Sequence, residues 1–128
     1  MKILLIIDSL EVGGAEVFFQ DLAAELSLEY NLEIVTLNSI GAIGHKMLKQ
    51  GYKINNFNFD TSYFPIFNFL SLFQYIRKSN PDIVHTWMYY SNFIGGFAAF
   101  FAGIKKIVWS IHAFNISQGL LKRRTIML

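Results

Sequence analysis

The sequence contains no cysteine, and charged residues make up only 16% of its 128 positions. The absence of cysteine excludes a disulfide scaffold, thiolate chemistry and any metal site built on thiolates, and it fits a reducing compartment. The basic runs are short, Lys105-Lys106 and Lys122-Arg123-Arg124, and the net charge is only +2. This excludes the strong basic footprint of a nucleic-acid-binding domain. A solvated face explains these runs better than contact with a phosphate or an anionic membrane.

No apolar run is long enough to cross a bilayer. The start, MKILLIIDSL, resembles a signal peptide until Asp8 interrupts it, and no small-residue cleavage site follows. We therefore expect a first strand there. The run FIGGFAAFFAGI, residues 93–104, has twelve apolar positions and follows Ser91 and Asn92. A buried helix is the favoured interpretation of this run, and a membrane-surface role is the alternative.

What the sequence does have is an excess of apolar residues. They reach 53%, and thirteen phenylalanines and six tyrosines are among them. An average soluble domain has fewer. The length suits one domain with a substantial core. Either much of its surface is apolar, or part of what normally covers that surface is missing.

Apolar periodicity alternates between strand and helix along the chain. Continuous aliphatic runs are typical of parallel strands covered on both faces. The alternation predicts βαβ units, hence an α/β fold with a doubly wound parallel sheet of about five strands. The expected strands are 2–7, 32–37, 52–57, 82–87 and 106–111, and the expected helices are 15–28, 42–50, a segment within 64–79 and about 89–102.

The third helix carries an aromatic stripe. Five residues at helical spacing predict its core face: Ile66, Phe69, Leu70, Phe73 and Ile76. Phe64 and Phe67, around Pro65, are candidates for an exposed apolar lip, and such lips mark contacts with partners or lipid. Asn80-Pro81 should end this helix. The last segment, LLKRRTIML, resembles the start of a further helix.

Ligands of open parallel sheets bind at the carboxyl ends of the strands. This rule selects residues 8–14, 85–87 and 110–115. Gly13 and Gly14 fall where a strand gives way to a helix, so bare backbone and helix N–H groups could receive a phosphate there. A tight turn explains the glycines equally well, because neither a dinucleotide fingerprint nor a Walker A loop is present. Helix capping is the simpler role for Glu16, and a turn the simpler one for Asp8.

Histidines and aromatic residues also follow these strands. His85 precedes Trp87, Tyr89, Tyr90 and Asn92, and this mixture of rings and amides suits a sugar. His112 follows the last strand with similar logic. By contrast, His45 falls in the second helix and is expected at the surface. No spacing of histidine and carboxylates indicates a metal site, and no serine elbow is present.

Three segments in order carry a family resemblance: GGAE, PDIVHTWMYYSNFIGGFAA and AGIKKIVWSIHAFN. Together they resemble the N-terminal domain of bacterial glycosyltransferase family 4, over essentially the whole chain. The resemblance implies a Rossmann-like domain, the N-terminal half of a GT-B architecture. Family members transfer a sugar from a nucleotide sugar to an acceptor, usually with retention of configuration and without a required metal or other cofactor.

The resemblance also implies roles for residues. Gly13, Gly14 and Glu16 match the loop that approaches the donor diphosphate. His85 and His112 match histidines that face the cleft, and His112 is the candidate catalytic residue. The candidates for acceptor or cleft contacts are His85, Trp87, Tyr89, Tyr90, Asn92 and Asn115. Two departures bear on these contacts: relatives often have histidine where Tyr90 stands, and an Arg-His pair near His112.

The second domain of the family, which holds the donor nucleotide, is absent from these residues. We therefore expect residues 1–128 to be a single truncated acceptor-binding domain that catalyses no transfer by itself. The resemblance implies a nucleotide sugar and a glycan or lipid-linked acceptor as partners, surface polysaccharide biosynthesis as the pathway, and the cytoplasmic face of the membrane as the location. A non-catalytic module that binds a membrane or a separate partner is the alternative, and a dehydrogenase half is disfavoured.

Overall fold

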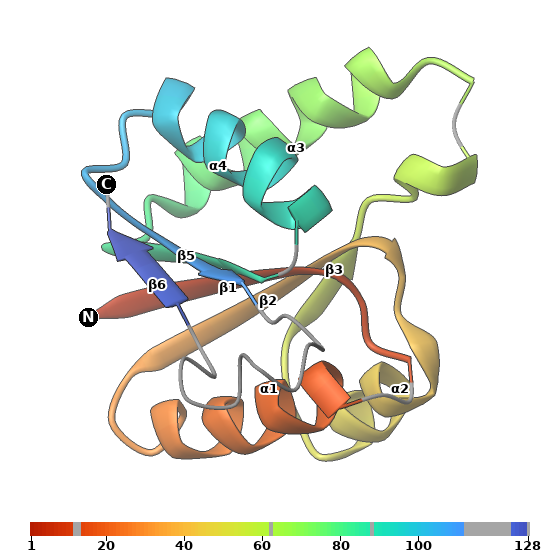
Figure 1. The fold of residues 1–128 in the computed structure, drawn as a ribbon, viewed down its shortest axis with the longest axis vertical. Coiled ribbons are helices and arrows are strands. Elements are labelled where there is room, and N and C mark those ends of the chain that lie inside the picture. The colour runs from red at the N-terminus through yellow and green to blue at the C-terminus, as the bar shows by residue number, and fades with distance from the viewer. Residues whose placement is uncertain (12–13, 62, 88, 112–123, 128) are drawn as a thin grey trace.

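The computed structural model describes residues 1–11, 14–61, 63–87, 89–111 and 124–127. Their centre is a six-stranded sheet in the order β3-β2-β1-β4-β5-β6 (Figure 1). The first five strands are mutually parallel, and β6 pairs antiparallel with β5. The strands are β1 (Lys2–Ser9), β2 (Asn31–Ser39), β3 (Ile54–Asn56), β4 (Ile83–Trp87), β5 (Lys106–Ile111) and β6 (Arg124–Met127).

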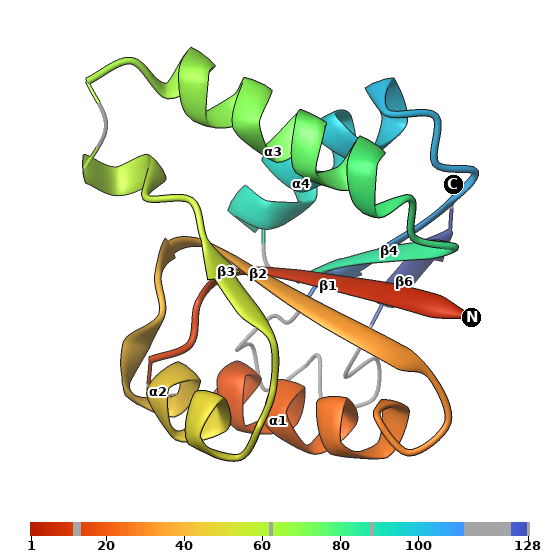
Figure 2. The same cartoon turned by 180° about the vertical axis from the view of Figure 1, so that it is seen from behind.

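Helices cover both faces of the sheet. Figures 1 and 2 show α1 and α2 on one face and α3 and α4 on the other. The bounds are α1 (Gly14–Leu26), α2 (Gly41–Lys49), α3 (Pro65–Ser79) and α4 (Tyr89–Phe101), with a short 3-10 helix η1 (Phe59–Thr61) before α3. The predicted doubly wound α/β fold is confirmed.

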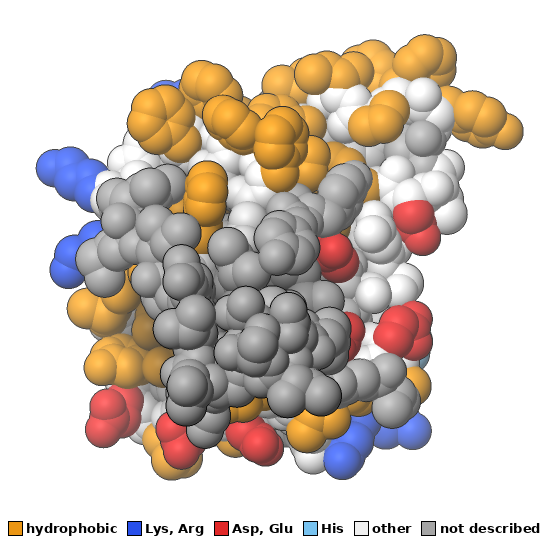
Figure 3. All heavy atoms as spheres, viewed as in Figure 1, with side chains coloured by type: hydrophobic (Ala, Val, Ile, Leu, Met, Phe, Trp, Pro, Cys, Tyr) orange, Lys and Arg blue, Asp and Glu red, His pale blue; other side chains and the backbone are white. Residues whose placement is uncertain are grey.

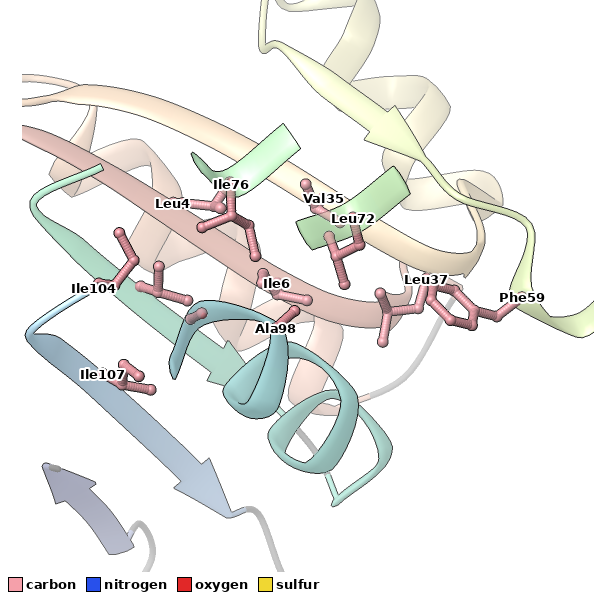
Figure 4. Packing of buried hydrophobic residues seen from close by; sticks show 12 residues of the cluster. Leu4, Ile6, Val35, Leu37, Phe59, Leu72, Ile76, Ala98, Ile104 and Ile107 are labelled. Carbon is pink, nitrogen blue, oxygen red and sulfur yellow. The ribbon is translucent and has the colours of Figure 1, made fainter. Parts of the chain in front are cut away.

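Two hydrophobic cores result from the period of two along each strand. Leu4 and Ile6 of β1 point to the side of α3 and α4, where Figure 4 shows them beside Leu72 and Ile76. The alternate residues of β1 pack on the other side, against α1 and α2. Because β1 is covered on both faces, its sequence is continuously aliphatic rather than alternating.

Special backbone conformations end two of the helices. Asn80 has φ +48° after α3, and its N–H donates to the carbonyl of Ile76. Gly103 has φ +85° after α4. A left-handed residue closes a helix in this way, and the proline after Asn80 prevents continuation. The predicted ends of both helices are confirmed.

The last segment differs from its prediction. Arg124–Met127 form β6 rather than the start of a helix, in register with Val108–Ile111 of β5. β5 would otherwise be an edge strand with unpaired backbone groups, and an antiparallel partner satisfies them. Thr125 and Ile126 are β-branched, which suits a strand.

The predicted core faces of α3 and α4 need correction. Leu72 and Ile76 of α3 are buried, but Ile66 and Leu70 are exposed. Figures 1 and 2 show that the first half of α3 extends past the sheet, so no core lies beneath it. The apolar run 93–104 is not a fully buried helix, because several of its phenylalanines face outward. Within the described residues, no helix is both long and apolar enough to cross a membrane.

Candidate functional site

The order in which the chain adds strands to the sheet reverses between β1 and β4. From β1 the chain moves to β2 and β3 on one side, and from β4 it moves to β5 on the other. The carboxyl ends of these two strands therefore form the topological switch point, where ligands of doubly wound folds bind. Helices α1 and α4 begin there on opposite faces of the sheet (Figure 1). The N-terminal ends of both helices carry partial positive charge.

The segment after β1 is held by the start of α2. The carbonyl of Leu10 accepts hydrogen bonds from the N–H of Ile43 at 2.9 Å and of Gly44 at 3.3 Å. Gly41 has φ +72°, and a Cβ there would lie 2.4 Å from the carbonyl carbon and oxygen of Leu10. Only glycine allows this close approach. Gly41 was not predicted from the sequence, where its only signal is a glycine just before the expected helix 42–50.

The predicted diphosphate loop is described in part. Helix α1 begins at Gly14, and Glu16 lies half-buried in its first turn. Gly13 lies outside the described residues. The start of α1 is therefore at the switch point, as the loop prediction requires, while the contacts of Gly13 stay a prediction.

His85 and Trp87 occupy alternate positions of β4 and share the face of the sheet that α1 covers. The indole of Trp87 is 1% exposed and lies 5.3 Å from the ring of Phe19 and 5.9 Å from that of Phe18, between centroids. The ring of His85, half-buried, lies 5.2 Å from Trp87. Trp87 therefore belongs to the core beneath the site in this conformation, with His85 next to it.

The first turn of α4 is tied to both neighbouring strands. The hydroxyl of Ser91 donates to the carboxylate of Asp8 at the end of β1. The hydroxyl of Thr86 donates to Oδ1 of Asn92 at 2.6 Å. Ser91 and Asn92 are both buried. Asn92, predicted as an acceptor contact, is thus engaged in positioning the helix.

Asp8 is a strand residue and not the turn residue that was favoured from the sequence. Its carboxyl is half-buried at the switch point. Burial raises the pKa of Asp8, and the hydrogen bonds from the side chain and backbone of Ser91 oppose that rise. The signal in the sequence was a single acid at the end of an aliphatic run, which does not reveal its partner.

The other predicted residues fall into three groups. Tyr89 and Tyr90 are the first two residues of α4, at the predicted edge. His112 and Asn115 lie outside the described residues. His45 is exposed on α2, as predicted. In the part of the chain that is described, no group of three histidines, aspartates or glutamates could hold a metal ion.

A hollow lies at the opposite edge of the sheet. It measures about 640 Å³ and is lined by residues from the end of α1 and the turns before β2 and β3, among them Tyr30, Asn31 and Tyr52. It is a wide, open hollow lined partly by exposed side chains. We assign the candidate site to the switch point instead, because helix N-termini and strand carboxyl ends meet there.

The chain is similar to a known protein family in sequence and to a solved structure in fold. Residues 12–128 match the model of Glycosyltransferase Family 4. The crystal structure of MurG from Acinetobacter baumannii superposes with a TM-score of 0.59 at 19% identity, over 93% of this chain and 38% of that one. No curated protein sequence matches the chain. The structural likeness shows a shared fold, and the chain spans well under half of that MurG. Because the family model covers nearly all of its residues, the chain belongs to glycosyltransferase family 4.

Proposed function

We propose that the chain is the acceptor-binding N-terminal domain of a GT-B glycosyltransferase, which transfers a sugar from a nucleotide sugar to a glycan or lipid-linked acceptor. The observation that carries this proposal is the position of α1, whose N-terminus opens at the switch point in a chain of this family. Retention of anomeric configuration, a role in surface polysaccharide synthesis, and work at the cytoplasmic membrane face are part of the same proposal.

The start of α1 serves the leaving group in this proposal. A departing nucleoside diphosphate gains negative charge, and fixed N–H donors at a helix start stabilise that charge. Gly14, the first residue of α1, has no Cβ to keep a diphosphate away from those donors. The hydrogen bonds from Ile43 and Gly44 of α2 hold Leu10 in place just after β1.

The acceptor sugar is assigned to the start of α4 and the end of β4. Tyr89 and Tyr90 begin α4, and tyrosine rings can stack on a sugar face while their hydroxyls form hydrogen bonds. His85 lies half-buried in β4, on the face of the sheet that α1 covers and α4 does not. Trp87 and Asn92 are buried, so we assign them to positioning these groups rather than to direct contact. His112 and Asn115 keep their proposed catalytic and cleft roles.

The donor nucleotide needs a second domain in this proposal. The family resemblance implies a nucleotide pocket in that domain, and the chain spans 38% of the MurG to which it is similar in structure. We therefore expect residues 1–128 to bind an acceptor but to transfer no sugar without that domain. The nucleotide sugar acts as a co-substrate, and no metal is required.

Calorimetric titration tests the proposal. The probes are UDP, GDP, UDP-N-acetylglucosamine, GDP-mannose and a short polyprenyl diphosphate that carries one sugar. The chain should bind the lipid-linked sugar and bind the nucleotides weakly. Gly14→Val removes the bare backbone at the start of α1, and Ala24→Val, at an exposed position of the same helix, is the matched control. Tight nucleotide binding that Gly14→Val leaves unchanged would contradict the glycine-loop role.

A non-catalytic binding module is the second candidate function. The exposed aromatic side chains of α3 and α4 favour it, because such surfaces mark contacts with partners or lipid. The same titrations separate the two candidates. A module of this kind would bind none of the sugar-bearing probes through the switch point.

A further inference from the structure

Helix α4 has an inverted distribution of side-chain sizes. Its inner face carries Gly95, Gly96, Ala98 and Ala99, all buried against the sheet. A Cβ at Gly96 would lie 2.8 Å from Nε1 of Trp109, so the helix approaches as closely as glycine allows. A helix that covers a core normally directs its large apolar residues inward. Here the core explains the small residues and leaves the phenylalanines unexplained.

The phenylalanines of α4 form a continuous outer stripe. Phe93, Phe97 and Phe101 follow each other at a spacing of four residues, with ring centroids 5.0 Å and 6.3 Å apart. Phe100 lies beside Phe101 at 5.6 Å. Phe93 is 63% exposed and Phe100 is 66% exposed. These rings contact one another and the solvent.

Residues at the start of α3 extend this apolar surface. Figure 3 shows hydrophobic side chains gathered along the side of the molecule that α3 and α4 form. We call this surface the phenylalanine ridge. Its members are Tyr63, Phe64, Ile66, Phe67, Leu70, Phe93, Phe97, Phe100 and Phe101, each of them 45% exposed or more. Exposed apolar residues scattered singly are ordinary, but a contiguous set of this size marks a contact surface.

The charges around the ridge are mainly of one sign. Neither α3 nor α4 contains an acidic residue. Arg77 and Lys78 are exposed in the last turn of α3, and Lys105 and Lys106 are exposed after α4. These four cations lie near the amino ends of β4 and β5, because Ile83, which begins β4 just after α3, pairs with Lys106, which begins β5. We call this end of the sheet the cationic edge.

Two acids lie near the ends of the ridge. At the cationic edge, the carboxylate of Asp82 accepts a hydrogen bond from the backbone N–H of Lys2. At the other end, Asp60 is exposed in η1. The cationic edge therefore keeps an excess of exposed positive charge, which complements an anionic surface.

We propose that the phenylalanine ridge inserts into the headgroup region of an anionic lipid bilayer, with α4 lying along the surface. A helix of this kind buries its aromatic face at the boundary between headgroups and acyl chains. Each nearby lysine or arginine adds about 1 kcal/mol on an anionic leaflet. A bilayer accommodates a row of exposed aromatic side chains without the matched pocket that a protein partner must supply.

The ridge and the candidate site share α4. The first turn of this helix is fixed at the switch point through Ser91 and Asn92, and the ridge begins at the next residue, Phe93. A bilayer on the ridge would therefore lie beside the site. For a lipid-linked acceptor this places the sugar near the start of α4, and this last step alone rests on the proposed function.

Vesicle flotation tests the contact. The protein is mixed with vesicles of phosphatidylcholine alone, or with about equal amounts of phosphatidylcholine and phosphatidylglycerol, and bound protein floats. We expect binding to the mixed vesicles that is several-fold stronger than to phosphatidylcholine. The double variant Phe93→Gln/Phe97→Gln should bind the mixed vesicles at least about tenfold more weakly than the unmodified protein, because two aromatic insertions are lost.

The matched control is Leu28→Gln/Leu48→Gln, which removes two exposed leucines that lie away from the ridge, after α1 and in α2. It should bind the mixed vesicles as the unmodified protein does. A second variant, Lys105→Gln/Lys106→Gln, should lose most of the preference for phosphatidylglycerol while it keeps binding through the ridge. Circular dichroism of each variant checks that the fold is unchanged.

Three results would overturn the proposal. The first is equal flotation of the ridge variant and the unmodified protein, and the second is no flotation of the unmodified protein. The third is a ridge-dependent dimer in sedimentation without vesicles, which would assign the ridge to a second copy. Because flotation uses no sugar, protein that floats but binds no lipid-linked sugar would contradict the proposed function and leave the lipid contact standing.

Discussion

The carboxylate of Asp8, at the end of β1, accepts a hydrogen bond from the hydroxyl of Ser91 in the first turn of α4. The bond joins two segments 83 positions apart in the sequence, at the edge where the sheet reverses direction. It fixes the start of α4 against the central strand. The positions of Tyr89 and Tyr90, and the beginning of the phenylalanine ridge, depend on this helix start.

Ser91→Ala should destabilise the protein. The variant removes a buried donor and leaves the half-buried carboxylate of Asp8 with one hydrogen bond fewer. Loss of a hydrogen bond to a charged group costs about 1–3 kcal/mol in the free energy of unfolding. Urea unfolding at neutral pH measures it. Ser27→Ala is the control, because the hydroxyl of Ser27 donates to a carbonyl at an exposed position and its loss should cost little.

Asp8→Asn should gain stability relative to the unmodified protein as pH rises. Burial raises the pKa of Asp8 above its ordinary value of 3.8, so folding favours the protonated carboxyl. That contribution is complete below the unfolded pKa and is lost as pH rises through the folded one. Asparagine does not titrate and still offers an oxygen to Ser91. Urea unfolding of both proteins between about pH 3 and pH 7 gives the difference. A difference that does not change with pH would contradict the assignment.

Glu33→Gln should show the opposite dependence on pH. Burial alone raises the pKa of Glu33, but hydrogen bonds from Tyr75 and Ser79 and the charges of Lys2 and Lys53 outweigh it, so the pKa lies below its ordinary value of 4.5. This stabilisation is present above pH 4.5 and is lost as pH falls through the folded pKa.

The expected cost of Glu33→Gln is about 1–3 kcal/mol near neutral pH, because a buried charged acceptor is lost. Urea unfolding in neutral and in acidic buffer measures it. The cost should shrink once the unmodified carboxyl is also protonated. A cost that is the same in both buffers would mean that the shape of the side chain matters and its charge does not.

Gly41→Ala should cost more stability than Gly51→Ala. Both glycines have positive φ, +72° and +99°, so alanine is strained at either by about 1–2 kcal/mol. Gly51 has open space around its Cβ position, whereas Gly41 faces the backbone of Leu10 at 2.4 Å, which cannot move aside cheaply. Overpacking of this kind adds about 1–3 kcal/mol. Thermal unfolding of the pair measures the excess, and equal costs would show that the segment after β1 yields easily.

Trp87→Ala should act through the fold. The indole is buried against Phe18 and Phe19, so its removal leaves a cavity that costs about 3–5 kcal/mol. Trp87→Phe keeps most of the volume and should cost much less. Urea unfolding ranks the two variants. If Trp87→Ala unfolds like the unmodified protein but binds lipid-linked sugar more weakly, the acceptor contact expected from the sequence is correct instead.

Much of the fold could be read from the sequence because its signals are local. The aliphatic run of β1, the helical spacing in α1 and the pair Asn80-Pro81 each depend on neighbouring residues alone. The strand alternation and the rule for parallel sheets then placed the candidate site at one edge. Gly14 and His85 became candidates by this route, since a strand end can be recognised without knowing what packs on it, and their roles stay a prediction.

The sequence by itself determined the order of the helices and strands up to β5, the parallel sheet and the edge proposed to carry the site, because hydrophobic period and turn residues encode them. Only the tertiary structure decided which side of each helix or strand faces the core, a neighbouring element or the solvent. It showed Trp87 in the core, Asp8 bonded to Ser91, Arg124–Met127 as a strand on β5, and the phenylalanines of α4 facing outward. An apolar residue reads the same whether a core or solvent lies beside it. That difference is set by neighbours that are distant in the sequence.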